Sequence, residues 1–119
     1  MVEVNGVEFV NLTPHDVVIF LNNQTITIPA SGTILRVQFK KKLVGWIAGI
    51  PVYRIELSNI DQLPPKKPNR YYIVSFLTLW AIQRTHKDRD DFLAPDTTPG
   101  SVVRDSLTGR IMGVRGFQK

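Results

Sequence analysis

The chain has 119 residues, 43% of them apolar, a formal net charge of +5 and no cysteine. This length suffices for one core but not for two, so we predict a single domain spanning residues 1–119. The lack of cysteine excludes a disulfide framework, a thiol nucleophile and a cysteine-based zinc site. No apolar run approaches the roughly 20 residues that cross a bilayer, and residues 1–4 do not read as a secretory leader. We therefore expect a cytoplasmic protein with no membrane contact.

Charge is unevenly placed along the chain. Up to residue 35 the charged residues are Glu3, Glu8 and Asp16, and all 15 Lys and Arg follow. This asymmetry predicts a basic face and a mildly acidic one, as in a protein that meets an anion on one side. A soluble surface with a modest basic excess explains the pattern equally well.

Short strands and tight turns dominate the first half of the chain. Residues 2–10 alternate around the favoured turn Asn5-Gly6 and predict a hairpin. Residues 40–42 are three lysines, which we place in a turn, and Ala48-Gly49 forms another turn. Further strands are predicted at residues 17–20, 25–28, 33–39, 43–47 and 52–57.

The second half combines strands with one helix. Residues 58–70 form a proline-rich loop, and residues 71–74 form a strand that ends at Ser75, a good N-cap. A helix should run from 76 to about 85, with apolar residues over more than half its circumference, so we expect it to be deeply packed. A charged loop at 87–91 and a final hairpin with strands at 101–104 and 111–117 complete the chain. The predicted fold is α+β, mostly antiparallel β in a curled sheet, sandwich or partly open barrel, with one buried helix.

The two histidines invite different interpretations. Pro14 fixes the backbone just before His15, which stands at the mouth of the strand at 17–20. There a histidine can act as a general base, a proton donor or a phosphate ligand, or it can pin the turn by bonding a backbone carbonyl. His86 ends the predicted helix, where a cation complements the helix dipole.

Acidic residues gather in the loops of the last third of the chain. Paired carboxylates can hold Mg²⁺ or perform acid–base chemistry. Here they alternate with Arg89 and Arg104, and Arg–Asp pairs that rigidify a loop explain the pattern at least as well. We therefore predict no metal and no other cofactor. The acidic set is Asp88, Asp90, Asp91, Asp96 and Asp105.

Two features could bind an anion. Guanidinium groups bond two oxygens at once, so the arginines of the last third could converge on a phosphate or carboxylate, or simply form a charged surface. At Ser75 the first amides of the helix point outward, which makes either an anion site or an ordinary N-cap. The arginines concerned are Arg89, Arg104, Arg110 and Arg115.

Basic residues could instead follow a nucleic-acid backbone. The lysines at 40–42 and 66–67, together with Arg70, have Trp46, Tyr71 and Tyr72 nearby for base stacking. Lysine triplets in turns are also common solubilising features. No Gly-x-Ser-x-Gly element accompanies the two histidines, so a serine hydrolase is not indicated.

Five segments taken together resemble one family of small phage and bacterial proteins that open with Asn-Leu-Thr-Pro-His. They are residues 11–15, 28–33, 72–75, 89–96 and the pair 103–105 with 109–115. The resemblance covers nearly the whole chain and implies no particular activity. Carried over position by position, it implies a site formed by Asn11, Thr13, His15, Ser75, Arg89, Asp91, Asp96, Arg104 and Asp105.

We thus expect a small phage- or prophage-type accessory protein that binds an anionic ligand, above all a nucleotide, without catalysis. His15, Arg89, Arg104 and the helix start at Ser75 would contact phosphate. One alternative is a phosphodiesterase or nuclease that uses His15 with Asp91 and Asp96. Another is a nucleic-acid or protein-interaction module. Pairing through an exposed edge strand would give a homodimer.

Overall fold

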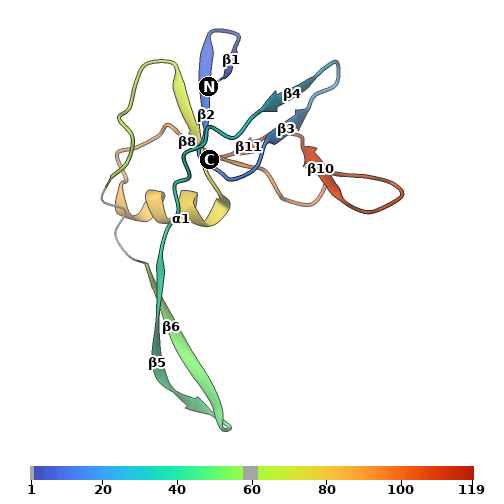
Figure 1. Ribbon diagram of the computed structural model, residues 1–119. Coiled ribbons are helices and arrows are strands. Elements are labelled where there is room, and N and C mark those ends of the chain that lie inside the picture. The colour runs from blue at the N-terminus through green and yellow to red at the C-terminus, as the bar shows by residue number, and fades with distance from the viewer. Residues whose placement is uncertain (1, 58–61) are drawn as a thin grey trace.

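The computed structural model describes residues 2–57 and 62–119 of the chain (Figure 1). A body of two sheets and one helix carries a two-stranded arm that projects away from it (Figure 1). The described part is mostly strand, its sheets curl without closing into a barrel, and the predicted α+β class is confirmed. The elements are β1 Val2–Val4, β2 Val7–Asn11, β3 Val17–Phe20, β4 Thr25–Ile28, β5 Phe39–Ile47, β6 Ile50–Leu57, β7 Arg70–Ile73, α1 Phe76–Thr85, β8 Phe92–Pro95, β9 Val102–Arg104, β10 Ile111–Val114 and β11 Phe117–Gln118.

The larger sheet has the strand order β1-β2-β7-β8-β11. Its outer pairs are antiparallel, but β7 pairs in parallel with both β2 and β8. The fold is mostly antiparallel, as expected, but the centre of this sheet is parallel. Strands β7 and β8 are parallel because α1 crosses between them and returns the chain in the same direction. Strand β8 was not expected. Its four residues follow the charged loop directly and alternate buried with half-buried positions, a signal too short to separate from loop.

The smaller sheet has the order β4-β3-β10-β9. It joins the predicted hairpin at residues 17–28 to the predicted C-terminal hairpin through a parallel contact between Val114 and Ile19. The first hairpin is also confirmed, with Asn5 and Gly6 at φ of 51° and 83°, the left-handed conformations that its two-residue turn requires.

The core lies on both faces of the larger sheet, and β7 with the residue after it shows how. Tyr72 and Val74 point toward the cluster that includes Leu79 and Ile82 of α1. Ile73 points the opposite way, into a cluster with Ile19 of the smaller sheet. Because successive strand residues face opposite sides, one strand helps to fix three layers: helix, large sheet and small sheet.

Helix α1 spans the predicted residues. The Ser75 hydroxyl caps it by accepting a hydrogen bond from the Thr78 amide at 3.3 Å. Only one face of the helix is buried, however, and Phe76, Leu77 and Trp80 are exposed. The expected packing around most of its circumference is therefore wrong, because the sheet covers a single side.

Within the described residues, strands β5 and β6 pair with each other and with no other strand, and they form the arm (Figure 1). The strand expected at 33–39 begins only at Phe39, and the three lysines lie inside β5 rather than in a turn. Residues 33–38 are irregular because Leu35 and Val37 pack against the body core instead of entering a sheet. The turn at Ala48-Gly49 is confirmed, with φ of 52° and 79°.

The arm gives the molecule an extended outline. The Cα radius of gyration of the molecule is 17.0 Å and its extents are 54 × 41 × 22 Å. A compact chain of this length has a radius of gyration of about 13.5 Å. Residues 62–69 follow the predicted irregular course, and 58–61 lie outside the described residues. Among the described residues, no helix is long and apolar enough to cross a membrane.

Candidate functional site

The Asn-Leu-Thr-Pro-His segment is organised around the side chain of Asn11, which is 1% exposed. Its Nδ2 donates to the carbonyls of His15 at 2.8 Å and Ile28 at 3.0 Å. Its Oδ1 accepts from the amide of Thr13 at 3.0 Å and from the hydroxyl of Thr13 at 2.6 Å. All the polar capacity of Asn11 is thus used inside the protein. The segment is a built turn that fastens β2 to the strands around β3.

His15 is held through its backbone carbonyl, and its side chain is exposed. It borders a cavity of about 330 Å³ whose other walls include Asp16, Pro95, Thr97 and Met112. The carboxylate of Asp16 accepts a hydrogen bond from the Ala30 amide at 3.1 Å. His15 therefore borders a largely apolar hollow, and the carboxylate of its neighbour Asp16 serves the turn.

Arg89 and Asp91 form a buried ion pair. Arg89 Nε and Nη2 each donate to a different oxygen of Asp91, both at 2.9 Å, and Nη2 also donates to the carbonyl of Pro64 at 2.8 Å. The guanidinium lies 5.0 Å from the ring centre of Phe92. The hydrogen bond to Asp91 raises the pKa of Arg89. This pair ties the proline-rich loop to β8, which is the loop-rigidifying alternative that the sequence offers for these residues.

The remaining predicted site residues shape turns. The carboxylate of Asp96 accepts from the amide and hydroxyl of Thr98 at 3.0 and 2.6 Å, and the hydroxyl bond lowers the pKa of Asp96. Arg104 donates to the Gly109 carbonyl at 2.9 Å, and Asp105 accepts from the Leu107 amide at 2.8 Å. Both of the latter bonds close the loop between β9 and β10.

The predicted site residues are thus distributed over several places. His15 borders the hollow between the sheets, Asp91 borders a separate cavity beneath residues 66–71, and neither cavity is lined by Arg104. No group of three or more His, Asp or Glu residues suited to a metal occurs among the described residues. Of the phosphodiesterase constellation, His15 and Asp91 line different cavities, and Asp96 is not among the lining residues of either.

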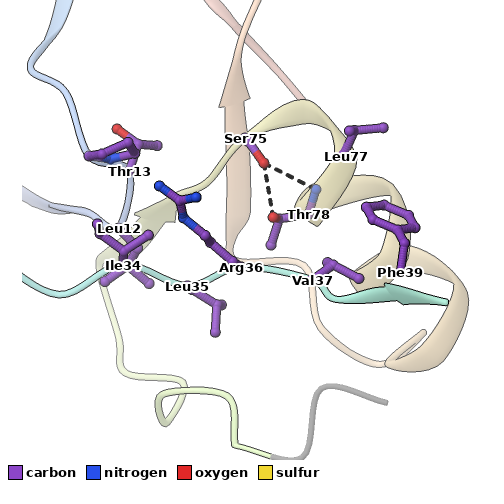
Figure 2. A pocket seen from close by; sticks show the side chains of 11 residues that line it. Leu12, Thr13, Ile34, Leu35, Arg36, Val37, Phe39, Ser75, Leu77 and Thr78 are labelled. Carbon is purple, nitrogen blue, oxygen red and sulfur yellow. Dashed lines mark hydrogen bonds between the residues drawn. The ribbon is translucent and has the colours of Figure 1, made fainter. Parts of the chain in front are cut away.

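Besides the contacts of Asn11 with Thr13 and of Arg89 with Asp91, two predicted residues from distant parts of the sequence share a cavity at the start of the helix. Thr13 and Ser75 line a cavity of about 270 Å³ that we call the helix-start cavity. Arg36 completes it, with its guanidinium directed toward the Thr13 side (Figure 2). Most of the other walls are apolar, including Leu77 and Phe39. Sequence reasoning missed Arg36 because it lies in the segment predicted as a regular strand, and only its place between two packed apolar residues could have signalled it.

The arm has two chemically different faces. Cross-strand partners share a face, and the register places Phe39, Lys41, Leu43 and Trp46 of β5 opposite alternate residues of β6. We call this side the apolar face. Its large apolar members are Phe39, Leu43, Trp46, Pro51, Tyr53, Ile55 and Leu57. Lys41 shares it, with its Nζ 4.4 Å from the Tyr53 ring centre.

The opposite face carries the other charges and part of the tip. Lys40 and Lys42 lie opposite Glu56 and Arg54, and Ile47 lies opposite Ile50 beside the turn. Lys66 and Arg70, predicted to join the lysines in one basic patch, are elsewhere and pair with Asp90 and Glu8. The expected basic patch is therefore split between arm and body.

A β-bulge keeps the apolar face continuous. Residues 43 and 46 would fall on opposite faces of a regular strand, but the register shifts between Leu43 and Gly45 and leaves Val44 as an extra residue. Trp46 is thereby placed on the same side as Leu43. This is why the alternation could not be followed through β5 in the sequence.

The apolar face is open to solvent. Trp46 is 66% exposed, and the arm supplies half of the large hydrophobic residues that the described chain leaves exposed. At its base the face continues into the body, because Phe39 also lines the helix-start cavity and Leu77 at the far wall belongs to the exposed side of α1. Arm, cavity and helix thus form one apolar surface.

Comparison of this chain with family models, curated proteins and solved structures finds no match. The resemblance to the phage and bacterial family therefore stays a prediction.

Proposed function

We propose that this protein is a non-catalytic accessory protein that works by protein–protein docking through its arm. The observation that carries the proposal is the continuous apolar face of β5 and β6. Contiguous exposed apolar surface on a soluble domain marks an interaction site. This function is a specific form of the interaction module considered from the sequence. The docking surface consists of the apolar residues of the arm and not of the lysines beside them.

The physics of a two-stranded ribbon supports this role. A hairpin that packs on nothing is marginally stable in water. The arm nevertheless has strands of nine and eight residues with paired backbones. Residues 43–53 carry no charge, and no residue of 40–56 belongs to either core cluster of the described chain. A partner surface that covers the apolar face would supply the missing packing.

Excision of the arm tests the proposal. Phe39 and Leu57 are cross-strand partners, so residues 40–56 can be replaced by Asn-Gly to close a short hairpin. We expect the excised protein to unfold cooperatively at nearly the melting temperature of the full chain and to lose every complex that the full chain forms. Failure of the excised body to fold, or identical complexes with and without the arm, would contradict the proposal.

An anionic ligand such as a nucleotide is the second candidate function. It is favoured by one arrangement: Arg36, Thr13 and the capped helix start line the same cavity, and the guanidinium of Arg36 is directed along it (Figure 2). Apolar walls beside a guanidinium suit a base next to a phosphate. Thermal shift with ATP and with inorganic phosphate tests it. ATP should stabilise the wild type and not Arg36→Ala, whereas Arg104→Ala should behave as wild type.

A further inference from the structure

We propose that the partner of the arm is a second copy of this chain, in a two-fold dimer whose arms run antiparallel with their apolar faces in contact. The tip of each arm, led by Trp46, then occupies the helix-start cavity of the other copy. This inference rests on the proposed docking function and names its partner. It is argued from the fact that one chain carries both the projecting and the receiving surface.

The continuity of the apolar surface from arm to cavity supports the dimer. The apolar face runs from the tip, at Trp46, to the base, at Phe39, and Phe39 is also a wall of the helix-start cavity. When two such ribbons lie antiparallel, each tip necessarily reaches the base of the other. Nine residues at about 3.3 Å each make β5 roughly 30 Å long, so the two faces overlap along their whole length. The same residues are then used on both partners, as two-fold symmetry requires.

The exposed area of the apolar surface also supports the dimer. Three aromatic residues of the surface, Phe39, Trp46 and Tyr53, are between 40% and 66% exposed. At roughly 150–250 Å² for each full side chain, their exposed parts amount to roughly 300 Å². With the exposed aliphatic residues Leu43, Ile55, Leu77 and Ile34 the surface reaches about 600 Å² per chain, or about 1,200 Å² in the dimer, which is the lower end of the range for specific interfaces.

The positions of the charged side chains on the arm also support the dimer. Lys40, Lys42 and Arg54 lie on the opposite face of the arm and stay in water when the apolar faces meet. Lys41 is the arm's one cation on the contact side, and its contact with the Tyr53 ring already directs it across an aromatic face. Long lysine stems can run along apolar surface to the solvent, so the contact buries no unpaired cation.

Sedimentation equilibrium of the purified chain tests the inference with matched variants. Trp46 and Ile47 are neighbours at the tip with nearly equal exposure, 66% and 68%, but they lie on opposite faces. The wild type should have twice the mass of 13.5 kDa. Trp46→Glu should weaken the dimer at least about 30-fold, as for a central aromatic anchor, and Ile47→Glu should change the dissociation constant less than about threefold.

Mixing two weakened variants tests the exchange itself. Leu77→Glu should disrupt the receiving cavity as Trp46→Glu disrupts the inserted tip. Alone, each variant has two damaged contacts per dimer. An equimolar mixture forms a heterodimer in which one tip and one cavity are both intact, so it should associate more tightly than either variant alone.

Three results would overturn the second-copy inference: a monomeric wild type, equal effects of the two tip variants, or no gain on mixing. A monomeric full chain that still loses a complex with another protein upon arm excision would leave the docking function standing and refute only the choice of partner. A folded excised body that forms the same assemblies as the full chain would refute both.

Discussion

Some of the predicted site residues hold a turn, and others border a cavity. The Asn-Leu-Thr-Pro-His segment contains both kinds. Asn11 satisfies two carbonyls and one amide from the interior. His15, four residues later, contributes its carbonyl to that network and leaves its ring exposed. Within these five residues, the histidine has the more reactive side chain, but the asparagine holds the structure together.

Asn11→Ala should lower the free energy of unfolding by about 3 kcal/mol, because it leaves buried backbone groups without partners. His15→Ala is the matched control and should stay within about 0.5 kcal/mol of wild type. Urea denaturation followed by circular dichroism measures both. A large effect of the His15 variant would show that its ring does more than border the cavity.

The ion pair of Arg89 and Asp91 should be worth far more than the neighbouring one. The side chains of Arg89 and Asp91 are 13% and 4% exposed, whereas those of Lys66 and Asp90 are 52% and 66% exposed. Asp91→Ala leaves a largely buried guanidinium uncompensated and should destabilise by about 3 kcal/mol or more. Asp90→Ala should leave the urea midpoint nearly unchanged, because both partners of that pair are exposed to solvent. Equal urea midpoints for the two variants would contradict this assignment.

Asp96 should contribute to acid sensitivity. Hydrogen bonds from Thr98 lower the pKa of Asp96 in the folded state. The ionised Asp96 therefore contributes fully to the free energy of unfolding above its unfolded-state pKa of about 3.9. This contribution is lost as the pH falls through the lower folded-state pKa. Asp96→Asn keeps the accepting oxygen but cannot titrate, so its urea midpoint should fall less between pH 5 and 2.5, approximately, than that of wild type. Parallel curves would refute this.

At the scale of elements, Val44 is the informative residue of the arm. It is the extra residue of the bulge, so its deletion should give a regular ribbon with the same cross-strand partners. We expect the Val44 deletion to keep the dimer dissociation constant within about threefold of wild type. Deletion of Ile55, which has a partner in Lys41, should weaken the dimer strongly because it displaces the tip from the apolar face. Sedimentation equilibrium distinguishes the two.

Local chemistry made several elements predictable. Asn5-Gly6 and Ala48-Gly49 fix turns by conformation alone, and Ser75 followed by a dense apolar run fixes the start of α1. Strand β8 and the parallel centre of the large sheet depend on distant residues, such as Arg70 beside Glu8, which no local pattern encodes. In the site, the N-cap position of Ser75 is visible in the sequence, whereas Thr13 is implied by the family resemblance alone. Arg36 was missed because its role comes only from the folded route of residues 33–38.

At the scale of the whole molecule, the apolar residues serve two separate purposes. Those of the body bury both faces of one sheet, whereas most of those of the arm, Leu57 at its base excepted, stay exposed in the part of the chain that the structure describes. Composition does not separate these two groups, since both look like ordinary core residues in the sequence. The pairing of β5 with β6 alone, away from the two sheets, is what distinguishes them.

The strand pairing also sets an order of events in time. The arm joins residues that are close in sequence, and such hairpins form in roughly 1–10 μs. Strand β2 must instead wait for β7, about sixty residues later in the chain, and long loop closures of this kind are slow. During refolding or synthesis the arm therefore exists before the body that carries it. Its uncovered face makes the early chain sensitive to concentration, and refolding yield should fall as protein concentration rises, much less so once residues 40–56 are excised.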